Sequence, residues 1–203
     1  MTKIKICGMR RKEDIEAVNQ YHPDACGFIL SKPFKRYVPE EQLKQLKALL
    51  DPEIFAFGVF VNEPAETVLS CYRKSLINGV QLHGDEDESF IAFLKKEEPQ
   101  MPVMKAFIIQ SEDDIDKAMT CSADLVLLDA GRGSGETFSW NLLKNMNRPY
   151  VLAGGLNPEN VQHAVSTLHP YGIDTSSGVE TEGFKDSEKI RLFIEKAREG
   201  EAV

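Results

Sequence analysis

The sequence predicts an α/β protein, a single closed (β/α)8 barrel that spans residues 1–203 as one domain. Short apolar runs rich in β-branched residues alternate with amphipathic stretches along the whole chain. Eight such runs begin 22 to 30 residues apart, and each interval accommodates one strand, one helix and two short loops. Hydrophobic residues make up 42% of the 203 residues, which is enough for one sizeable core.

The eight strands are expected as parallel strands that helices cover from outside. The run Phe55–Val61 illustrates this, because it is apolar at nearly every position. An open doubly wound sheet is the alternative, but it usually has five or six strands, so eight even units favour the TIM barrel. The expected strands are Lys3–Cys7, Ala25–Leu30, Phe55–Val61, Asn78–His83, Pro102–Phe107, Asp124–Asp129, Pro149–Ala153 and Tyr171–Thr175.

Several helices between these strands carry their own start signals. Pro39 and two glutamates precede one amphipathic stretch, and Ser111 with three acidic residues precedes another. The run Asn157-Pro-Glu-Asn is expected to open a helix over Val161–Leu168. Ser139, directly before Trp140, is expected to cap the helix after the sixth strand.

Composition excludes several classes of function. The chain has 24 basic and 32 acidic residues, so its net charge of −8 makes it a poor candidate for nucleic-acid binding. No apolar run approaches the ~20 residues that cross a bilayer, and the N-terminus lacks a signal peptide, so a cytoplasmic location is expected. The four cysteines have no CxxC spacing and histidines are few, so neither a disulfide framework nor a metal site is expected.

Function in such a barrel belongs at the carboxyl ends of the strands. Cys7 ends the first expected strand and is followed by a glycine. Many free cysteines are simply small buried hydrophobes, but this position makes Cys7 a candidate reactive group. Asp129 ends the sixth strand on the same face as Leu125 and Leu127. Its ordinary role would be a helix cap, which Ser139 is better placed to supply, so Asp129 is also a candidate for chemistry.

The ends of the seventh and eighth strands predict an anion site. Gly154 and Gly155 follow the seventh strand, and the run Ser176-Ser177-Gly178 follows the eighth. This fold often binds phosphate between those two loops and the amino end of a short helix, expected here just after Ser177. Arg36, in a basic stretch after the second strand, can hold a second anion, typically a carboxylate. His83, at the end of the fourth strand, is counted among the expected substrate-binding residues, as an orienting or packed residue and not as a base.

With these strand ends the chain resembles the phosphoribosylanthranilate isomerase family over essentially its whole length. The resemblance rests on eight ordered segments at strand ends and loops. They are Lys5-Ile-Cys-Gly8, Gly27-Phe-Ile-Leu30, Gly58-Val-Phe-Val-Asn62, Val80-Gln-Leu-His-Gly-Asp85, Leu127-Leu-Asp129, Gly133-Ser-Gly135 with Phe138 and Trp140, Leu152-Ala-Gly-Gly-Leu156, and Ser176-Ser-Gly-Val-Glu180 followed by Lys185-Asp186.

The resemblance implies an Amadori rearrangement of N-(5-phosphoribosyl)anthranilate in tryptophan biosynthesis, with no cofactor and no obligate protein partner. By that resemblance Cys7 is the general base and Asp129 the general acid. Arg36 would bind the anthranilate carboxylate, Asp174 would line the sugar site, and the glycine-rich ends of strands seven and eight would hold the phosphate. Ser139 stands where relatives often have Asp, and the loop after Asp129 is shorter than in many of them.

The implied chemistry needs Cys7 as thiolate and Asp129 protonated, although the ordinary pKa values favour the opposite states at neutral pH. Lys5, two residues before Cys7 on the same strand face, is placed to lower the pKa of Cys7, and burial is expected to raise that of Asp129. The alternatives are another phosphosugar-binding barrel isomerase and a non-catalytic phosphate-binding barrel. A histidine-pathway isomerase would carry Asp in place of Cys7, and a pentose-phosphate epimerase would need metal ligands.

Overall fold

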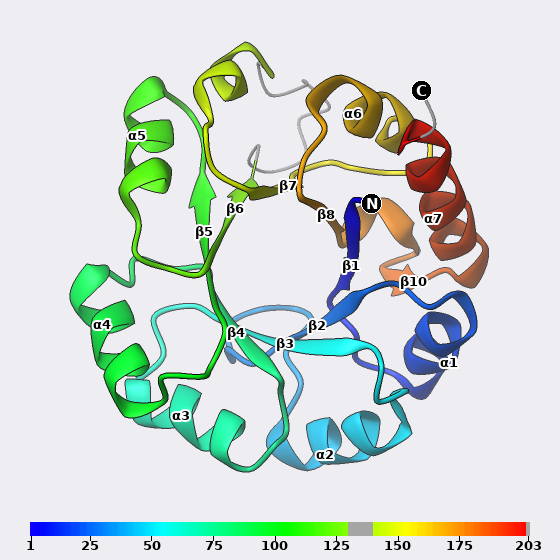
Figure 1. The fold of residues 1–203 in the computed structure, drawn as a ribbon. Coiled ribbons are helices and arrows are strands. Elements are labelled where there is room, and N and C mark those ends of the chain that lie inside the picture. Colours follow the sequence, from blue (N-terminus) through cyan, green and yellow to red (C-terminus); the bar gives the residue numbers. More distant parts are fainter. Residues whose placement is uncertain (130–139, 202–203) are drawn as a thin grey trace.

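The computed structural model describes residues 1–129 and 140–201, and these form a closed barrel of eight parallel strands in the order β1 to β8 (Figure 1). The predicted fold is therefore confirmed, and every predicted strand agrees with the observed one to within one residue at each end. The strands are β1 (Lys3–Cys7), β2 (Ala25–Ile29), β3 (Phe55–Phe60), β4 (Gly79–Leu82), β5 (Val103–Ile108), β6 (Leu125–Asp129), β7 (Tyr150–Ala153) and β8 (Gly172–Thr175).

Helices surround the barrel and cover the outer faces of its strands (Figure 1). Their starts follow the sequence signals: Pro39 immediately precedes α2, Asp114 accepts the backbone N–H of Ser111 before α5, and Asn157 accepts the N–H of Asn160 before α6. The α-helices in the described ranges are α1 (Lys12–Tyr21), α2 (Glu40–Leu49), α3 (Ala65–Arg73), α4 (Glu88–Glu97), α5 (Glu112–Thr120), α6 (Val161–Leu168) and α7 (Ser187–Glu201).

Two helical predictions need correction. The segment that begins at Trp140 is a 3-10 helix, η1 (Trp140–Asn145), and its expected cap Ser139 lies outside the described residues. The short helix expected just after Ser177 is a single 3-10 turn, η2 (Ser177–Val179), and the next α-helix begins at Ser187.

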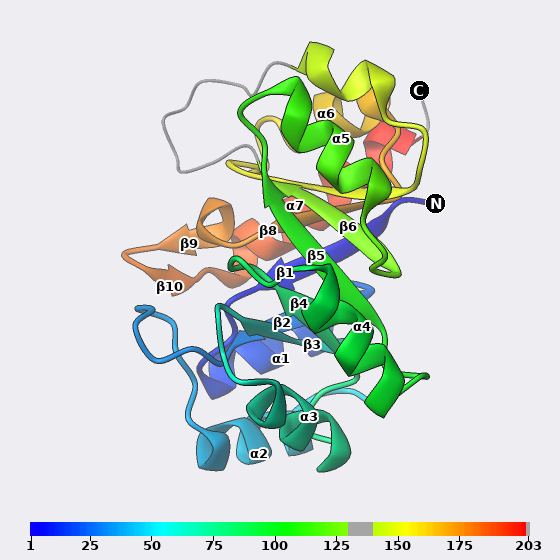
Figure 2. The same ribbon diagram turned by 90° about the vertical axis from the view of Figure 1, so that its left-hand side faces the viewer.

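A short antiparallel hairpin follows this 3-10 turn. Its strands β9 (Glu180–Thr181) and β10 (Phe184–Lys185) are joined by Glu182 and Gly183, which both have positive φ angles. Such angles at both central residues suit the tight turns that connect antiparallel strands. Figure 2 shows this hairpin and the loop after β2 at one end of the barrel, opposite the N-terminus.

Pairing between the first and last strands closes the barrel. Lys5 of β1 lies opposite Asp174 of β8, and Ile6 lies opposite Thr175. Inside, Leu125 and Leu127 share one face as predicted, and they belong to a small apolar cluster that also includes Phe57, Met104, Ala106, Val151 and Ala153. The larger core fills the space between the outer face of the strands and the helices. Among the described residues, no helix combines the length and the apolar character that crossing a bilayer requires.

One buried carboxylate ties the loops beyond β3 and β4 to a side chain of strand β5. Glu86 accepts the backbone N–H of Asn62 at 2.7 Å and that of Gly84 at 2.9 Å. Lys105 donates to the same carboxylate at 3.0 Å and to the Gly84 carbonyl at 2.6 Å. Both charged groups are buried and hydrogen-bonded, and we call this pair, Glu86 with Lys105, the rim clamp. It fixes the loop that carries His83 and the loop after β3.

Candidate active site

Three of the predicted site residues meet at the end of β1. The side chain of Cys7 is buried, and Ser176 donates a hydrogen bond to its backbone carbonyl at 3.1 Å. Gly8 follows with a φ of +86°, and a Cβ atom there would lie 2.7 Å from Cδ of Arg36. Arg36 therefore lies directly over the backbone next to Cys7, and only glycine leaves room for it.

Glu180, from the hairpin strand β9, holds Arg36 in place. The Arg36 guanidinium donates to both oxygens of Glu180 at 2.7 Å, and Lys185 donates to the same carboxylate at 2.7 Å. Burial alone would raise the pKa of Glu180, but these two cations lower it to about 2. Lys185 also donates to the Ser176 carbonyl at 2.7 Å, so the hairpin is anchored to the loop after β8.

The sequence did not assign roles to Glu180 and Lys185, although both belong to the motif after the eighth strand. Glu180 meets Arg36 across 144 positions of the chain, a contact that spacing does not reveal. One sequence feature could have indicated their role: Glu180 and Lys185 are oppositely charged and lie close together just beyond the end of the eighth strand.

Lys5 and Asp174 form a buried ion pair beneath Cys7, with 2.9 Å between Nζ and Oδ2. A Cβ atom on Gly27 would lie 2.8 Å from Sγ of Cys7 and 3.2 Å from Nζ of Lys5. The Cys7 thiol and the Lys5 ammonium group therefore lie close together, both against Gly27 of β2. Asp174 Oδ1 is buried and has no hydrogen-bond partner among the described residues, which leaves it as an acceptor for a ligand hydroxyl.

The protonation of Cys7 differs from the sequence-based expectation. Burial raises the pKa of the Cys7 thiol above its ordinary value, and Lys5 and Lys185 oppose that rise. Asp174 adds to it, because a neighbouring negative charge disfavours a thiolate. Lys5 thus acts in the predicted direction, but the predicted net lowering is wrong because burial outweighs it.

Asp129 lies at the end of β6 with His83 beside it. Nε2 of His83 is 3.4 Å from Oδ2 of Asp129, and Nδ1 of the same ring is 3.4 Å from Nε2 of Gln81. The His83 ring therefore contacts both the Gln81 amide and the Asp129 carboxyl group. His83 is thereby placed beside the carboxyl group of Asp129. Residues 130–139, directly after Asp129, lie outside the described part of the chain.

The two halves of the site are linked electrostatically through Asp174. Its pKa is raised by burial and lowered by Lys5, and the charges of His83 and Asp129 act on it as well. The pKa of Asp174 therefore responds both to Lys5, next to Cys7, and to His83 and Asp129. The predicted base and acid thus belong to one interior electrostatic environment.

The glycine-rich loops after β7 and β8 lie against each other. Thr175 donates to the Leu156 carbonyl at 2.6 Å, and Gly178 packs so closely on that carbonyl that a Cβ atom has no room. Gly154 and Gly155 have φ angles of +93° and +66°, and nothing lies within 4 Å of the Cβ position on Gly155. Gly155 therefore borders open space, whereas Gly178 serves close packing. The expected helix dipole is missing from this site, because η2 with Ser177 has only three residues.

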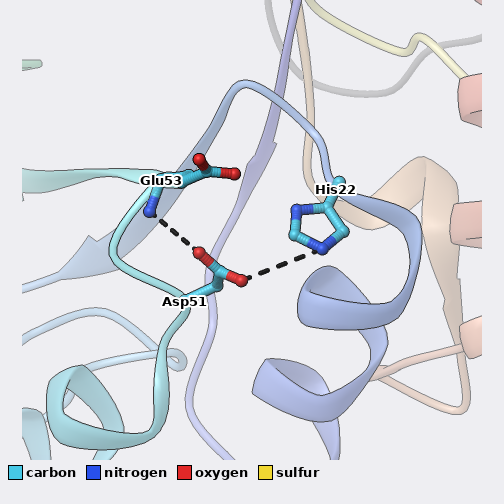
Figure 3. A group of neighbouring side chains, drawn as sticks. All are labelled: His22, Asp51 and Glu53. Atoms are coloured by element: carbon cyan, nitrogen blue, oxygen red, sulfur yellow. Dashed lines mark hydrogen bonds and ion pairs between the residues drawn. The ribbon is translucent and has the colours of Figure 1, made fainter.

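A different group of polar side chains lies at the opposite end of the barrel (Figure 3). His22 follows α1, and Asp51 and Glu53 precede β3. Asp51 accepts the backbone N–H of Glu53 at 2.9 Å, and its other oxygen is 3.8 Å from Nε2 of His22. The ligand-type atoms of the three lie within 4.8 Å of one another. These loop contacts account for the arrangement of the group, which is remote from Cys7.

Comparison with known families agrees with this geometry. The model of the family described as N-(5'phosphoribosyl)anthranilate (PRA) isomerase matches residues 4–196. N-(5'-phosphoribosyl)anthranilate isomerase from Thermoanaerobacter pseudethanolicus is 44% identical over 205 residues, which cover 98% of each chain. The protein of the same name from Acetivibrio thermocellus is 42% identical, over 99% of this chain and 98% of the relative.

Solved structures give the same result. The crystal structure of phosphoribosyl anthranilate isomerase from Thermotoga maritima superposes with a TM-score of 0.90 at 37% identity, covering 98% of this chain and 99% of that one. A second phosphoribosyl anthranilate isomerase structure, with a TM-score of 0.87, 36% identity and the same coverage, holds reduced 1-(o-carboxyphenylamino)-1-deoxyribulose 5-phosphate.

Proposed function

Since this chain belongs to the N-(5'-phosphoribosyl)anthranilate isomerase family, we propose that Cys7 is the general base and Asp129 the general acid of its reaction. The enzyme converts N-(5'-phosphoribosyl)anthranilate to the 1-deoxyribulose 5-phosphate product in tryptophan biosynthesis. This Amadori rearrangement moves protons and electron pairs within one molecule, and we propose that it needs no cofactor.

In the first step, Asp129 gives its proton to the ribose ring oxygen. The bond from that oxygen to C1 of the sugar breaks, and the anthranilate nitrogen supplies the electron pair that forms a C=N bond. The geometry that supports this role is the position of Asp129 at the end of β6, where Oδ2 of its carboxyl group lies 3.4 Å from Nε2 of His83. A positioned acid contributes about 10²–10⁴-fold to a rate.

In the second step, the Cys7 thiolate takes the proton from C2 of the sugar. The electron pair of that C–H bond forms a C1–C2 double bond, and the nitrogen receives the electrons of the C=N bond. The resulting enolamine becomes the ketone when C1 gains a proton and the C2 hydroxyl loses one. The single observation that carries the assignment of Cys7 is its burial beside Lys5 and Asp174, inside the barrel at the end of β1.

The proposed function also assigns binding groups to the carboxylate, a sugar hydroxyl and the phosphate of the substrate. We propose that Arg36 binds the anthranilate carboxylate and that Oδ1 of Asp174 accepts a hydrogen bond from a sugar hydroxyl. Phosphate would lie in the open space beside Gly155, where the backbone is free to approach it. The ligand in the related structure carries a carboxylate at one end and a phosphate at the other, which fits this division.

Kinetics of two variants test the catalytic roles. Cys7→Ala and Asp129→Asn should each lower kcat by at least about 100-fold and change KM little, because each removes a proton-transfer group and spares the binding groups. Matched controls are Cys26→Ala, a buried cysteine of the outer core, and Asp124→Asn, at the other end of the same strand. Both controls should retain kcat. Retention of more than a tenth of the wild-type kcat in Cys7→Ala would remove Cys7 from the role of base.

We propose further that residues 1–203 act as one domain, in the cytoplasm and without an obligate protein partner. The pairing of β1 with β8 supports one domain, because strands from both ends of the chain complete the same barrel. A single cooperative unfolding transition, full activity of the purified chain and cell fractionation would test these three points.

A further inference from the structure

The surroundings of Cys7 are richer in charge than the two-residue mechanism requires. Lys5 comes from β1, Asp174 from β8, Lys185 from β10 and Arg36 from the loop after β2, and each of these charges acts on Cys7 or is affected by it. β2 contributes no titratable side chain to this group, because its one titratable residue, Cys26, belongs to the outer core.

The ammonium group of Lys5 is the cation best placed to act on the sulfur. It is buried, donates to Asp174 at 2.9 Å, and lies 6.0 Å from the centre of the Phe57 ring. Because Gly27 has no side chain, Nζ of Lys5 and Sγ of Cys7 both approach the same point of β2. Lys5 is thus confined to one place, so its charge is available to the thiol without reorganisation.

The charged side chains around Cys7 do not balance when Cys7 is a neutral thiol. Lys5, Lys185 and Arg36 are cationic, whereas the carboxylates that hold them are only two, Asp174 and Glu180. With Cys7 as a neutral thiol, these five side chains carry one excess positive charge. A thiolate at Cys7 balances this charge. Burial opposes that ionisation by raising the pKa of the thiol, and the neighbouring ammonium group of Lys5 favours it.

We propose that Lys5 is a positioning residue for the base, whose ammonium group, held by Asp174, stabilises the thiolate form of Cys7 in the free enzyme. Asp174 acts in the opposite direction through its own negative charge, and it also keeps Lys5 in place. The inference deepens the proposed function and rests on it only where turnover is concerned. Titration of the Cys7 thiol itself involves no substrate.

The test is a pH titration of Cys7 without substrate. Thiolate absorbance in the ultraviolet is recorded for each protein minus that of its own Cys7→Ala derivative, so that only Cys7 contributes. Lys5→Met should move the midpoint upward by at least about one pH unit, which means about tenfold less thiolate at neutral pH. Lys5→Arg retains a cation and should restore most of the wild-type midpoint. Asp174→Asn removes the opposing charge and should move the midpoint downward.

The opposite directions in Lys5→Met and Asp174→Asn separate an electrostatic role from simple damage to the fold. If Lys5→Met does not fold because Asp174 remains unpaired, Lys5→Met/Asp174→Asn removes both charges, and its midpoint should still lie above the wild-type value. Shifts of the same sign in the two single variants, or no shift in Lys5→Met and in the double variant, would overturn the proposal.

Turnover gives the second readout. In Lys5→Met the limb of the kcat/KM profile that reports Cys7 should follow the titration to higher pH, and kcat at neutral pH should fall about tenfold. If the titration shifts as expected while Cys7→Ala remains active, the base assignment fails and the link between Lys5 and Cys7 stands. If Cys7→Ala is inactive and the titration does not respond to Lys5, the base stands and this inference fails.

Discussion

Replacement of Glu180 by Gln should destabilise the protein in a way that disappears in acid. Glu180 is the shared acceptor of Arg36 and Lys185, and together they lower its pKa from 4.5 to about 2. A shift of that size corresponds to roughly 3 kcal/mol, but the side chain of Arg36 is 26% exposed, so screening by solvent reduces the expected contribution to about 1–2 kcal/mol.

The sign of the pH dependence follows from the lowered pKa. The stabilisation by Glu180 is fully present above its unfolded pKa of 4.5 and is lost as the pH falls through the folded value of about 2. A protonated glutamate resembles glutamine in size and charge. The difference between wild type and Glu180→Gln should therefore shrink in acid, losing about two fifths of its neutral-pH value by about pH 3.5.

Urea unfolding of both proteins between pH 7 and pH 3.5 measures this difference. At neutral pH, Glu180→Gln should unfold with about 1–2 kcal/mol less free energy than wild type, or at a Tm roughly 5 °C lower. Glu188→Gln, on the exposed start of α7, is a matched control that removes a surface ion pair and should change stability by less than about 1 kcal/mol. A Glu180→Gln effect of the same size at every pH would refute the reasoning.

The remaining predictions concern substrate binding. Arg36→Met should weaken binding by about 1.5–3 kcal/mol, seen as a tenfold or larger rise in KM, because a charge-assisted bond to the carboxylate is lost. Glu180→Gln, which keeps Arg36, should raise KM less, and an unchanged KM in Arg36→Met would show that the carboxylate is bound elsewhere. Gly155→Asn should raise KM and weaken competitive inhibition by sulfate, since Asn tolerates the φ of +66° and its side chain fills the open space. Unchanged sulfate inhibition in the folded variant would exclude this phosphate site.

The strands were predictable from sequence because each is a compact apolar run, and burial on both faces is a local signal. The hairpin β9–β10 was not, since strands of two residues carry no periodicity. Because no periodicity marks these short strands, the sequence did not reveal the hairpin, and a helix was expected just after Ser177. The extended chain there is set by the turn at Glu182 and Gly183 and by the anchoring of Lys185 to Ser176.

The candidate site divides along a similar line. Cys7, Asp129 and the glycines could be proposed from their places at strand ends, because the barrel brings all those ends to one face. Lys5 could also be proposed as a neighbour of Cys7, but the ion pairs that hold Lys5 and Arg36 in place could not be predicted. Arg36 with Glu180, and Lys5 with Asp174, are contacts between opposite ends of the chain. The net effect of burial on Cys7 also depends on packing around the sulfur, which single-strand patterns do not describe.

The rim clamp of Glu86 and Lys105 has a consequence for the entropy of binding. The Glu86 carboxylate, held by Lys105, accepts the backbone N–H groups of Asn62 and Gly84. It therefore fixes Gly84, which directly follows His83, and the loop after β3. The conformational freedom of these loops is therefore given up when the chain folds, not when the substrate arrives. An active site whose walls are ordered in advance devotes more of its interaction energy to the ligand itself. The free energy of folding is correspondingly less favourable, because the charged groups of Glu86 and Lys105 lose their hydration when the chain folds.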